Sequence, residues 1–201
     1  MDRSIDKGIQ PITLTGTHVR LEPASTDHAE AMCRAAHDRP FTLFSRHIDS
    51  GTVEGCREQL QFLIDHPTTL PFSLFDAKTD ELIGGTTYCD IRAQHRGVEI
   101  GWTWITKERR GTIVNPEMKY LLLRHAFETD LFETGPAIRV VLKTHHLNKR
   151  SQAAISKLGA KHEANLRNHV IMPDGSYRHS VVYSVLEDEW EEVKQDLLKR
   201  I

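Results

Sequence analysis

Two polar segments that precede predicted helices carry the residue types and spacings most able to do chemistry. In the first, Arg109, Arg110 and Gly111 bring positive charge and a flexible backbone to a helix that we expect Asn115 to cap, with Pro116 at its first position. The N–H groups at a helix start have no partners within the helix, so they attract anions such as phosphate. This loop therefore fits a phosphate-binding site, although an ordinary capped helix after a solvated loop would explain the same residues.

The second segment runs from Asn148 to Ser151 and begins a helix that Gly159 ends. Asn and Ser are frequent at helix starts as caps, which is the simplest explanation of both residues. A third candidate is Glu99, on a predicted strand over 98–105. Along this strand Glu99, Gly101 and Thr103 alternate with the apolar residues Ile100, Trp102 and Trp104. Glu99 could be a solvent-facing carboxylate on the sheet, or it could accept a proton in a reaction.

Motifs for several other chemistries are absent from the sequence. The dinucleotide-binding motif G-x-G-x-x-G, the P-loop motif G-x-x-x-x-G-K-[ST] and the zinc motif H-E-x-x-H do not occur. Their absence argues against a dinucleotide site, a P-loop nucleotide site and a zinc site of these types. The 12 histidines show no metal-binding spacing, so we expect no metal. Cys33, Cys56 and Cys89 are odd in number and far apart, which favours reduced thiols in the cytoplasm over disulfides.

The composition is that of a soluble globular protein. Hydrophobic residues make up 39% of the chain and charged residues 27%, and the net charge of -2 argues against a nucleic-acid partner. No stretch approaches the roughly 20 apolar residues of a membrane span, and residues 1–12 lack the apolar core of a signal peptide. We therefore expect one cytoplasmic domain over residues 1–201, without a membrane partner and with residues 1–12 as a mobile lead-in.

The hydrophobic pattern alternates between strand and helix periods along the chain. Strands are expected at 18–22, 72–75, 82–91, 98–105, 137–142, 167–172 and 177–186, and a turn at 173–176 joins the last two. Helices are expected at about 25–36, 50–67, 116–129, 148–158 and 187–201. This order predicts a single mixed α/β domain.

The order of elements resembles the GNAT superfamily of N-acetyltransferases, and particular segments carry the resemblance. Residues 99–105, Glu-Ile-Gly-Trp-Thr-Trp-Ile, are similar to the family's fourth strand, and Arg110-Gly111 is similar to the start of its pyrophosphate loop. Asn148-Lys-Arg-Ser151, followed by Gly159-Ala160, is similar to the helix beside the thioester. The resemblance implies a GNAT fold of the α/β (α+β) class, with a mixed, mostly antiparallel central sheet of about seven strands flanked by helices.

Within the superfamily, the chain is most similar to the ribosomal-protein N-terminal acetyltransferases of the RimJ/RimL type. The Asn-x-x-Ser helix start and the closing hairpin, with Asn165, Gly175 and Tyr183, carry this part of the resemblance, which spans roughly Thr13 to Glu189. It implies acetyl-coenzyme A as co-substrate and an amine as acceptor. A homodimer is common in this branch and is a further expectation.

The resemblance also implies a role for each candidate residue. Glu99 would act as a base through water, and Ser151 as the acid that protonates the departing sulfur while the amine attacks directly. A backbone N–H near Trp104 or Ile105 would polarise the thioester carbonyl. The coenzyme-binding residues it implies are Trp104, Ile105, Arg109, Arg110, Gly111, Thr112, Val114, Asn115 and Asn148.

The chain departs from the family pattern at three positions. Ile113 stands where the loop has its second glycine, and a β-branched residue adopts positive φ only at a cost, so we expect ordinary backbone angles or weaker phosphate binding. Ile155 replaces the tyrosine that serves many members as the acid. Val170 stands where some members of the branch have a further glutamate. The Asn-x-x-Ser branch uses the serine as the acid, and the resemblance assigns that role to Ser151.

The acceptor is the part of the reaction that the sequence leaves open. The loop with Phe41 and Phe44 and the turn at 173–177 are the expected walls of its groove, and no acidic cluster there favours a polyamine. A protein N-terminus is implied by the branch alone. The alternatives are a small-molecule amine, or a non-catalytic module that only binds acyl-coenzyme A.

Overall fold

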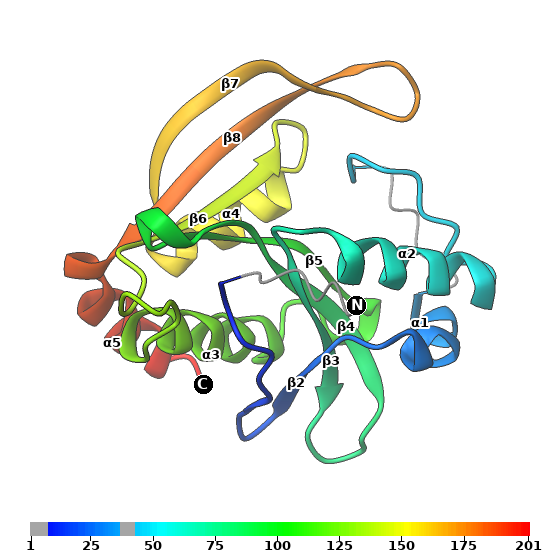
Figure 1. The fold of residues 1–201 in the computed structure, drawn as a ribbon, viewed down its shortest axis with the longest axis horizontal. Helices are drawn as coiled ribbons and strands as arrows, with labels where there is room; N and C mark the ends of the chain where they lie inside the picture. The colour runs from blue at the N-terminus through cyan, green and yellow to red at the C-terminus, as the bar shows by residue number, and fades with distance from the viewer. Residues whose placement is uncertain (1–7, 37–42) are drawn as a thin grey trace, which may run out of the picture.

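An eight-stranded sheet forms the centre of the computed structural model, which describes residues 8–36 and 43–201. The strands follow the order β1-β2-β3-β4-β5-β6-β8-β7 (Figure 1). Their bounds are β1 Leu14–Thr15, β2 Val19–Pro23, β3 Leu70–Asp76, β4 Leu82–Arg92, β5 Gly97–Ile105, β6 Arg139–His145, β7 Lys161–Ile171 and β8 Tyr177–Leu186. The expected mixed, mostly antiparallel sheet is confirmed, with one more strand because the two-residue β1 is too short to show a period in the sequence.

The sheet is split between β5 and β6. These two strands are parallel, whereas the other neighbouring strands of the sheet are antiparallel. They pair only where Gly97 to Glu99 lies opposite Arg139 to Val141. Beyond Glu99, β5 stays on β4 and β6 stays on β8. The two strands therefore separate, and an opening forms between them.

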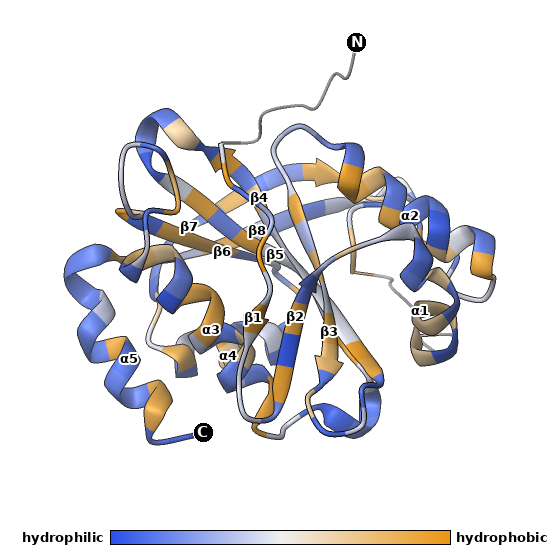
Figure 2. Ribbon diagram, turned by 60° about the horizontal axis from the view of Figure 1, so that its bottom comes forward, coloured by the Kyte–Doolittle hydropathy of each residue, from blue (hydrophilic) through white to orange (hydrophobic). Residues whose placement is uncertain are grey.

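Helices cover both faces of the sheet (Figures 1 and 2). On one face, α1 (Ala29–Ala36) and α2 (Val53–Asp65) share a cluster of buried side chains with Phe75 and Trp104. On the other, α3 (Val114–Glu128) and α5 (Trp190–Leu198) pack in the larger core, together with Leu74 and with Ile155 of α4 (Lys149–Leu158). Leu74 and Phe75 fall into different clusters because successive side chains of a strand point to opposite faces.

Helix α3 begins two residues before the start predicted from the sequence. Ile113, rather than Asn115, occupies the N-cap position, and its side chain makes no capping bond. The N–H of Glu117 makes the first helical hydrogen bond, to the carbonyl of Ile113 (3.0 Å). Pro116 is thus the third helical residue, where a missing N–H still costs nothing. The predicted cap at Asn115 is wrong because a first-turn proline tolerates several helix starts.

The beginning of the chain is attached to α3. Residues 1–7 of the expected mobile lead-in lie outside the described residues, whereas Ile9 is 5% exposed in the larger core. The Glu117 carboxylate accepts hydrogen bonds from the N–H groups of Thr17 (2.6 Å) and His18 (2.8 Å). These bonds anchor the first hairpin to the helix whose N-terminus borders the opening in the sheet.

Candidate functional site

A cavity of about 540 Å³ occupies the opening between β5 and β6. Its walls come from both separated strands, from the loop after β5 and from the first turns of α3 and α4. The structure thus brings together segments that are far apart in the sequence. The candidate residues that line it are Glu99, Trp104, Ile105, Arg110, Gly111, Thr112, Asn115, Asn148 and Ser151.

A β-bulge in β5 shapes one wall. Between the pair Thr87–Gly101 and the pair Gly85–Trp104, β5 has one residue more than β4. Trp102 lies in the bulge with φ of 51°. A positive φ costs a bulky residue about 1–3 kcal/mol, so the packing around Trp102 must hold it there. The sequence predicts regular alternation over 98–105, and the bulge corrects that prediction.

The loop after β5 has left-handed backbone at one residue only. Gly111 takes φ of 74°, which glycine adopts without strain. Ile113 is helical, with φ of -62° and ψ of -21°, so the departure from the family pattern requires no unusual backbone there. Arg110 donates from Nε to the carbonyl oxygen of Ile105 (2.9 Å). This bond holds the Arg110 guanidinium at the cavity wall.

Two of the predicted coenzyme-binding residues point elsewhere. Arg109 pairs with Asp76 at the end of β3, with 2.8 Å between Nη2 and Oδ2, and does not line the cavity. Val114 is 3% exposed in the larger core, and its N–H donates to Thr112 Oγ1 (3.3 Å). The sequence could not separate Arg109 from Arg110, because adjacent loop arginines look alike until the turn between them is known.

Trp104 and Ile105 contribute to the cavity mainly through their backbone. Both side chains are 7% exposed, and they pack in opposite cores. The Trp104 indole belongs to the cluster under α1 and α2, and Ile105 belongs to the larger core under α3. The strand between the two cores therefore presents its main chain to the opening.

Helix α4 starts at the cavity, and its cap uses one of the candidate residues. The side-chain oxygen of Asn148 accepts a hydrogen bond from the N–H of Ser151 (3.1 Å). Asn148 is thus the N-cap, the simpler of the two explanations, and its amide nitrogen remains for a ligand. Within the described part of the chain, the Ser151 hydroxyl makes no hydrogen bond. Ser151 is therefore free to bond a ligand in the cavity.

Glu99 lies where β5 and β6 separate. Its side chain is 13% exposed, and its Oε2 lies 2.7 Å from the Nζ of Lys143 on β6. The ammonium of Lys143 is also 3.9 Å from Asp90. Sequence reasoning missed Lys143, because only the parallel register of β5 and β6 brings it to Glu99. The ion pair fixes the position of the carboxylate at the cavity wall.

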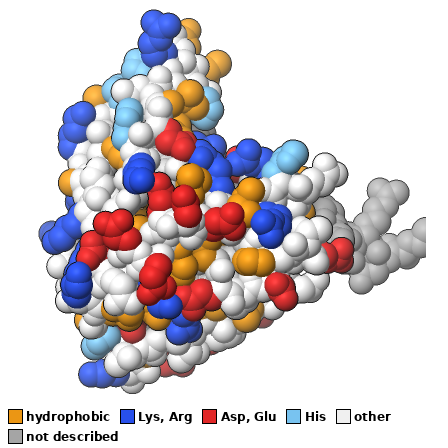
Figure 3. Space-filling view, turned by 90° about the vertical axis from the view of Figure 1, so that its left-hand side faces the viewer, with side chains coloured by type: hydrophobic (Ala, Val, Ile, Leu, Met, Phe, Trp, Pro, Cys, Tyr) orange, Lys and Arg blue, Asp and Glu red, His pale blue; other side chains and the backbone are white. Residues whose placement is uncertain are grey.

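The cavity lining is strongly basic. Among the described residues, Glu99 is its sole acidic residue, against seven basic ones: Lys119, Lys143, Lys157, Arg110, Arg150, Arg178 and Arg200. Burial and the neighbouring Arg150 lower the pKa of Arg110, and burial lowers the pKa of Arg178. In contrast, the side of the molecule that carries α5 mixes acidic and basic side chains (Figure 3). The basic lining fits a ligand with several phosphates.

Lys119 is a further residue that sequence reasoning missed. It lies on α3, is 7% exposed, and donates from Nζ to Thr103 Oγ1 (3.1 Å). Burial lowers the pKa of Lys119 to about 7. Its residue type predicts a surface lysine, and the wide buried surface of α3 that includes it is known only from the packing.

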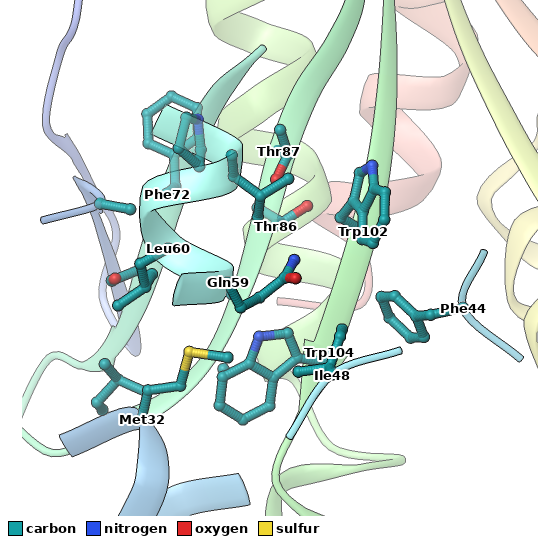
Figure 4. Close-up of a pocket in the computed structure, with 17 residues that line it drawn as sticks. Met32, Phe44, Ile48, Gln59, Leu60, Phe72, Thr86, Thr87, Trp102 and Trp104 are labelled. Carbon is teal, nitrogen blue, oxygen red and sulfur yellow. The ribbon is translucent and has the colours of Figure 1, made fainter. Parts of the chain in front are cut away.

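A smaller pocket of about 30 Å³ lies on the α1–α2 side of the sheet (Figure 4). We call it the aromatic pocket. It shares Phe44, Trp102 and Trp104 with the large cavity, and Gln59 of α2 extends into it. No residue of its described lining has an ionisable side chain: Ala24, Met32, Phe44, Ile48, Gln59, Leu60, Leu63, Pro71, Phe72, Ser73, Leu82, Gly84, Gly85, Thr86, Thr87, Trp102 and Trp104.

Some of the residues predicted to line the acceptor groove do line one of the two pockets. Phe44 lines both pockets, whereas Phe41 lies outside the described residues. The turn at 173–177 lines neither pocket; His169, Val170 and Arg178, from the strands beside it, reach the large cavity instead. The hairpin therefore contributes its strands rather than its turn.

Three further observations concern metal ions, cysteines and membrane-spanning helices among the described residues. They contain no group of three or more His, Cys, Asp or Glu side chains that could hold a metal ion. Cys33, Cys56 and Cys89 are free thiols. No helix in the described ranges is long and apolar enough to cross a membrane.

Comparison with known proteins places these features in a family. The family described as "Acetyltransferase (GNAT) domain" matches residues 18–161. A solved structure of a provisionally named acetyltransferase is 37% identical, with a TM-score of 0.85, 95% of this chain covered and 94% of that one. Another, from T. thermophilus, is 38% identical, with a TM-score of 0.85 and coverage of 96% and 98%. Among curated protein sequences, none matches.

A more distant structure shares the fold alone. The ribosomal-protein-S5-alanine acetyltransferase of Vibrio fischeri is 16% identical, with a TM-score of 0.70, 89% of this chain covered and 98% of that one. The family match covers most of the chain, and the basic cavity in the split sheet fits the phosphates of coenzyme A. The chain therefore belongs to the GNAT family of acetyltransferases and is an N-acetyltransferase that uses acetyl-coenzyme A as co-substrate.

Proposed function

We propose that this enzyme transfers the acetyl group directly from coenzyme A to a primary amine, with Glu99 as the base and Ser151 as the acid. The observation that carries the proposal is one cavity with both residues and seven basic side chains on its wall. Bound acetyl-coenzyme A supplies an activated acyl carbon. The protein must then hold the phosphates, remove a proton from the amine and return one to the sulfur.

Arg110, Gly111 and the start of α3 are proposed to hold the pyrophosphate. Gly111 turns the loop through its positive φ, and the positive end of α3 favours an anion. Asn115 supplies the backbone N–H there, because Pro116 has none and that of Val114 donates to Thr112. Asn115 in the first turn and Arg150 beside Arg110 add hydrogen-bond donors. The Thr112 hydroxyl already donates to the carbonyl oxygen of Arg109 (2.7 Å), so we propose that it stabilises the loop rather than binding phosphate.

Glu99 is proposed to take a proton from the acceptor amine through water. An ammonium ion has no lone pair for attack, so a base near the amine increases the fraction that can react. Lys143 holds one carboxylate oxygen of Glu99, which leaves the other for a water molecule. Glu99 accepts the proton that the ammonium loses before its nitrogen attacks the thioester carbon. A second proton leaves the nitrogen as the amide forms, and it replaces the proton that Ser151 gives to the sulfur.

Ser151 is proposed to protonate the departing sulfur. Its hydroxyl is available because the cap of α4 uses only its backbone N–H. The amide nitrogen of Asn148 would bond the pantetheine arm. The backbone of Trp104 and Ile105, next to the bulge, would polarise the thioester carbonyl as negative charge develops on its oxygen.

For the acceptor, we propose a primary amine without a second positive charge, and specifically a protein N-terminus. The aromatic pocket has no ionisable residue among those described, which disfavours polyamines because a buried ammonium needs a counter-charge. The N-terminus itself rests on the RimJ/RimL-type spacing of Asn148 and Ser151. A single domain over residues 1–201, a cytoplasmic location and a homodimer stay predictions.

Amine-dependent release of the coenzyme A thiol tests this function. The panel contains a peptide with a free N-terminus, the same peptide acetylated at its N-terminus, a simple monoamine and a polyamine. We expect release with the free peptide and none with the acetylated one. Coenzyme binding without turnover on any amine would indicate a non-catalytic module, and turnover on small amines alone would indicate a small-molecule acceptor.

A further inference from the structure

Gln59 is a buried amide whose oxygen has no hydrogen-bond partner in the part of the chain that the structure describes. Its side chain extends from α2 into the aromatic pocket, between Trp102 and Trp104 (Figure 4). Gln59 is 3% exposed, and no described residue donates a hydrogen bond to its Oε1. Leaving a buried amide unpaired is destabilising, and such groups are rare in native proteins. Gln59 therefore points to a partner that binds in the pocket.

Two of the other polar side chains of the pocket already have partners. Ser73 Oγ lies 2.8 Å from His28 Nδ1, and Thr86 Oγ1 lies 2.8 Å from Thr103 Oγ1. These hydroxyl groups bond to residues outside the pocket, whereas the Gln59 oxygen is buried without a partner among the described residues. Among residues 8–36 and 43–201 none is a partner for this oxygen, which makes a ligand or a water molecule the candidate.

The pocket is narrow and its walls are closely packed. The rings of Phe44 and Trp102 lie 5.6 Å apart, and a Cβ on Gly85 would come within 2.8 Å of the Trp104 indole nitrogen. Its volume of about 30 Å³ holds about two water molecules, or the few atoms of one small functional group. Only the part of an acceptor next to its reacting amine can therefore enter.

The pocket adjoins the large cavity, because Phe44, Trp102 and Trp104 line both. A group bound beside Gln59 would therefore lie next to the three side chains that also border the cavity with Glu99. If the proposed function is right, that group belongs to the acceptor. The contact with Gln59 then lies close to the amine.

We propose that Gln59 determines acceptor specificity by pairing its amide with an uncharged amide group next to the reacting amine. This inference rests on the proposed function and names the acceptor class. The side chain of Gln59 offers one acceptor oxygen and one donor NH₂, so an amide can bond to it in both directions. A peptide N-terminus and a small amino-acid amide both have such a group.

The composition of the pocket selects against other acceptors. A carboxylate or a second ammonium would lose its hydration there without a counter-charge among the lining residues. A plain alkyl group of the same size would fit but would leave the Gln59 amide unpaired. Sites built around a buried polar group reject ligands that lack the matching group, so the alkyl amine should be the poorer substrate.

The test compares two acceptors on the wild type and on Gln59→Leu. Glycinamide has the amide and propylamine does not, and thiol release gives kcat/KM for each. We expect the glycinamide-to-propylamine ratio to fall about tenfold or more in Gln59→Leu, with the coenzyme A dissociation constant unchanged. Comparing ratios between the two proteins cancels the different basicities of the amines. A glycinamide-to-propylamine ratio that is unchanged in Gln59→Leu would overturn the proposal.

Gln61→Leu is the matched control, because it makes the same substitution on the same helix. Gln61 bonds to Asp65 on the surface (2.7 Å), so this variant should keep the wild-type ratio. If Gln59→Leu fails to fold, Gln59→Met, which is flexible and helix-compatible, replaces it. A tripeptide amide with a free N-terminus distinguishes a peptide acceptor from a small amino-acid amide. If Gln59→Leu lowers kcat/KM for the tripeptide but not for glycinamide, the proposal that Gln59 recognises the amide group common to both is wrong. No turnover of any amine by the wild type would reject the proposed function, and this inference with it.

Discussion

The linings of the large cavity and of the aromatic pocket differ in charge. The cavity between β5 and β6 has seven basic side chains against Glu99, whereas the described lining of the aromatic pocket has no ionisable side chain. Positive charge suits the phosphates of a coenzyme, because electrostatic attraction acts over distance and requires little steric complementarity between ligand and site. Shape and single hydrogen bonds suit an uncharged acceptor. If the proposed function is right, the enzyme attracts its co-substrate by charge and selects its acceptor by close fit.

Each side also keeps one buried polar group that the fold alone does not require. Lys119 is 7% exposed beside the large cavity, and Gln59 is 3% exposed in the aromatic pocket. Replacing either by an apolar residue of similar size should therefore stabilise the fold. The size and the pH dependence of the gain should differ, because Lys119 titrates and Gln59 does not.

The largest effect on stability is expected for Lys119→Met. Burial lowers the pKa of Lys119 from 10.5 to about 7, so between these values the unfolded chain binds a proton that the folded chain does not. Wild-type stability therefore falls as the pH drops from 10.5 to 7. The variant should be more stable by about 3–5 kcal/mol at pH 6, and by little near pH 10.

Urea unfolding of both proteins at pH 6 and pH 10 measures this difference. Lys161→Met is the control, since the Lys161 side chain is 72% exposed and should show no such gain. The groups that face Lys119 are Cys89 on β4 and, beyond it, the pair of Glu99 and Lys143. An equal gain at both pH values would mean that the lysine is not held uncharged in the fold.

The next largest effects concern catalysis on the cavity side. Glu99→Gln and Ser151→Ala should each lower kcat by about tenfold or more, because each removes a proton-transfer group. Coenzyme A affinity should change little in either variant, since neither residue is assigned to the phosphates. Steady-state thiol release and equilibrium binding measure the two quantities. Wild-type kcat in both variants would show that the roles are assigned to the wrong residues.

The adjacent arginines provide a matched pair. Arg110→Ala should weaken coenzyme A binding by about tenfold, because a charge-assisted contact is lost. Arg109→Ala should leave that affinity unchanged, since the Arg109 guanidinium pairs with Asp76 outside the cavity. Isothermal titration with coenzyme A measures both. Equal losses would mean that both arginines reach the phosphates, as the sequence alone predicts.

The smallest expected effect lies at Asp76. Hydrogen bonds from the backbone N–H groups of Lys78 and Thr79, and the Arg109 charge, lower the pKa of Asp76 below 3.8 despite its burial. A carboxylate with a lowered pKa stabilises the fold above its unfolded pKa, and this stabilisation is lost as the pH falls through the folded value. Asp76→Asn should cost about 1–2 kcal/mol at pH 7, and less below pH 3.8. A constant difference over this range would contradict the assignment.

Sequence reasoning reached the charged side more fully than the neutral one. Arg110, Gly111 and Ser151 could be singled out because basic loops, glycines and helix starts have chemistry that follows from residue type. Gln59 could not, since a glutamine on an amphipathic helix has the appearance of a surface residue until the packing of α2 is known. The aromatic pocket, built from tryptophans and glycines, resembles core in the sequence.

The differences between sequence and structure on the charged side have a common physical cause. The local pattern predicts a cap at Asn115, a regular strand through Trp102 and an Arg109 guanidinium directed toward phosphate. The structure changes them through contacts with distant residues: Asp76 takes the Arg109 guanidinium, and the extra residue at the bulge is defined only by pairing with β4. Lys143 was missed for the same reason, since a parallel register brings it to Glu99.

A crystal structure with coenzyme A and an acceptor amide tests the central comparison most directly. We predict the pyrophosphate at Arg110 and the backbone of Gly111, the sulfur between Glu99 and Ser151, and the acceptor amide on Gln59 in the aromatic pocket. Phosphates bound away from the basic cavity, or an acceptor that enters without touching the aromatic pocket, would contradict the division of the site into a charged side and a neutral side.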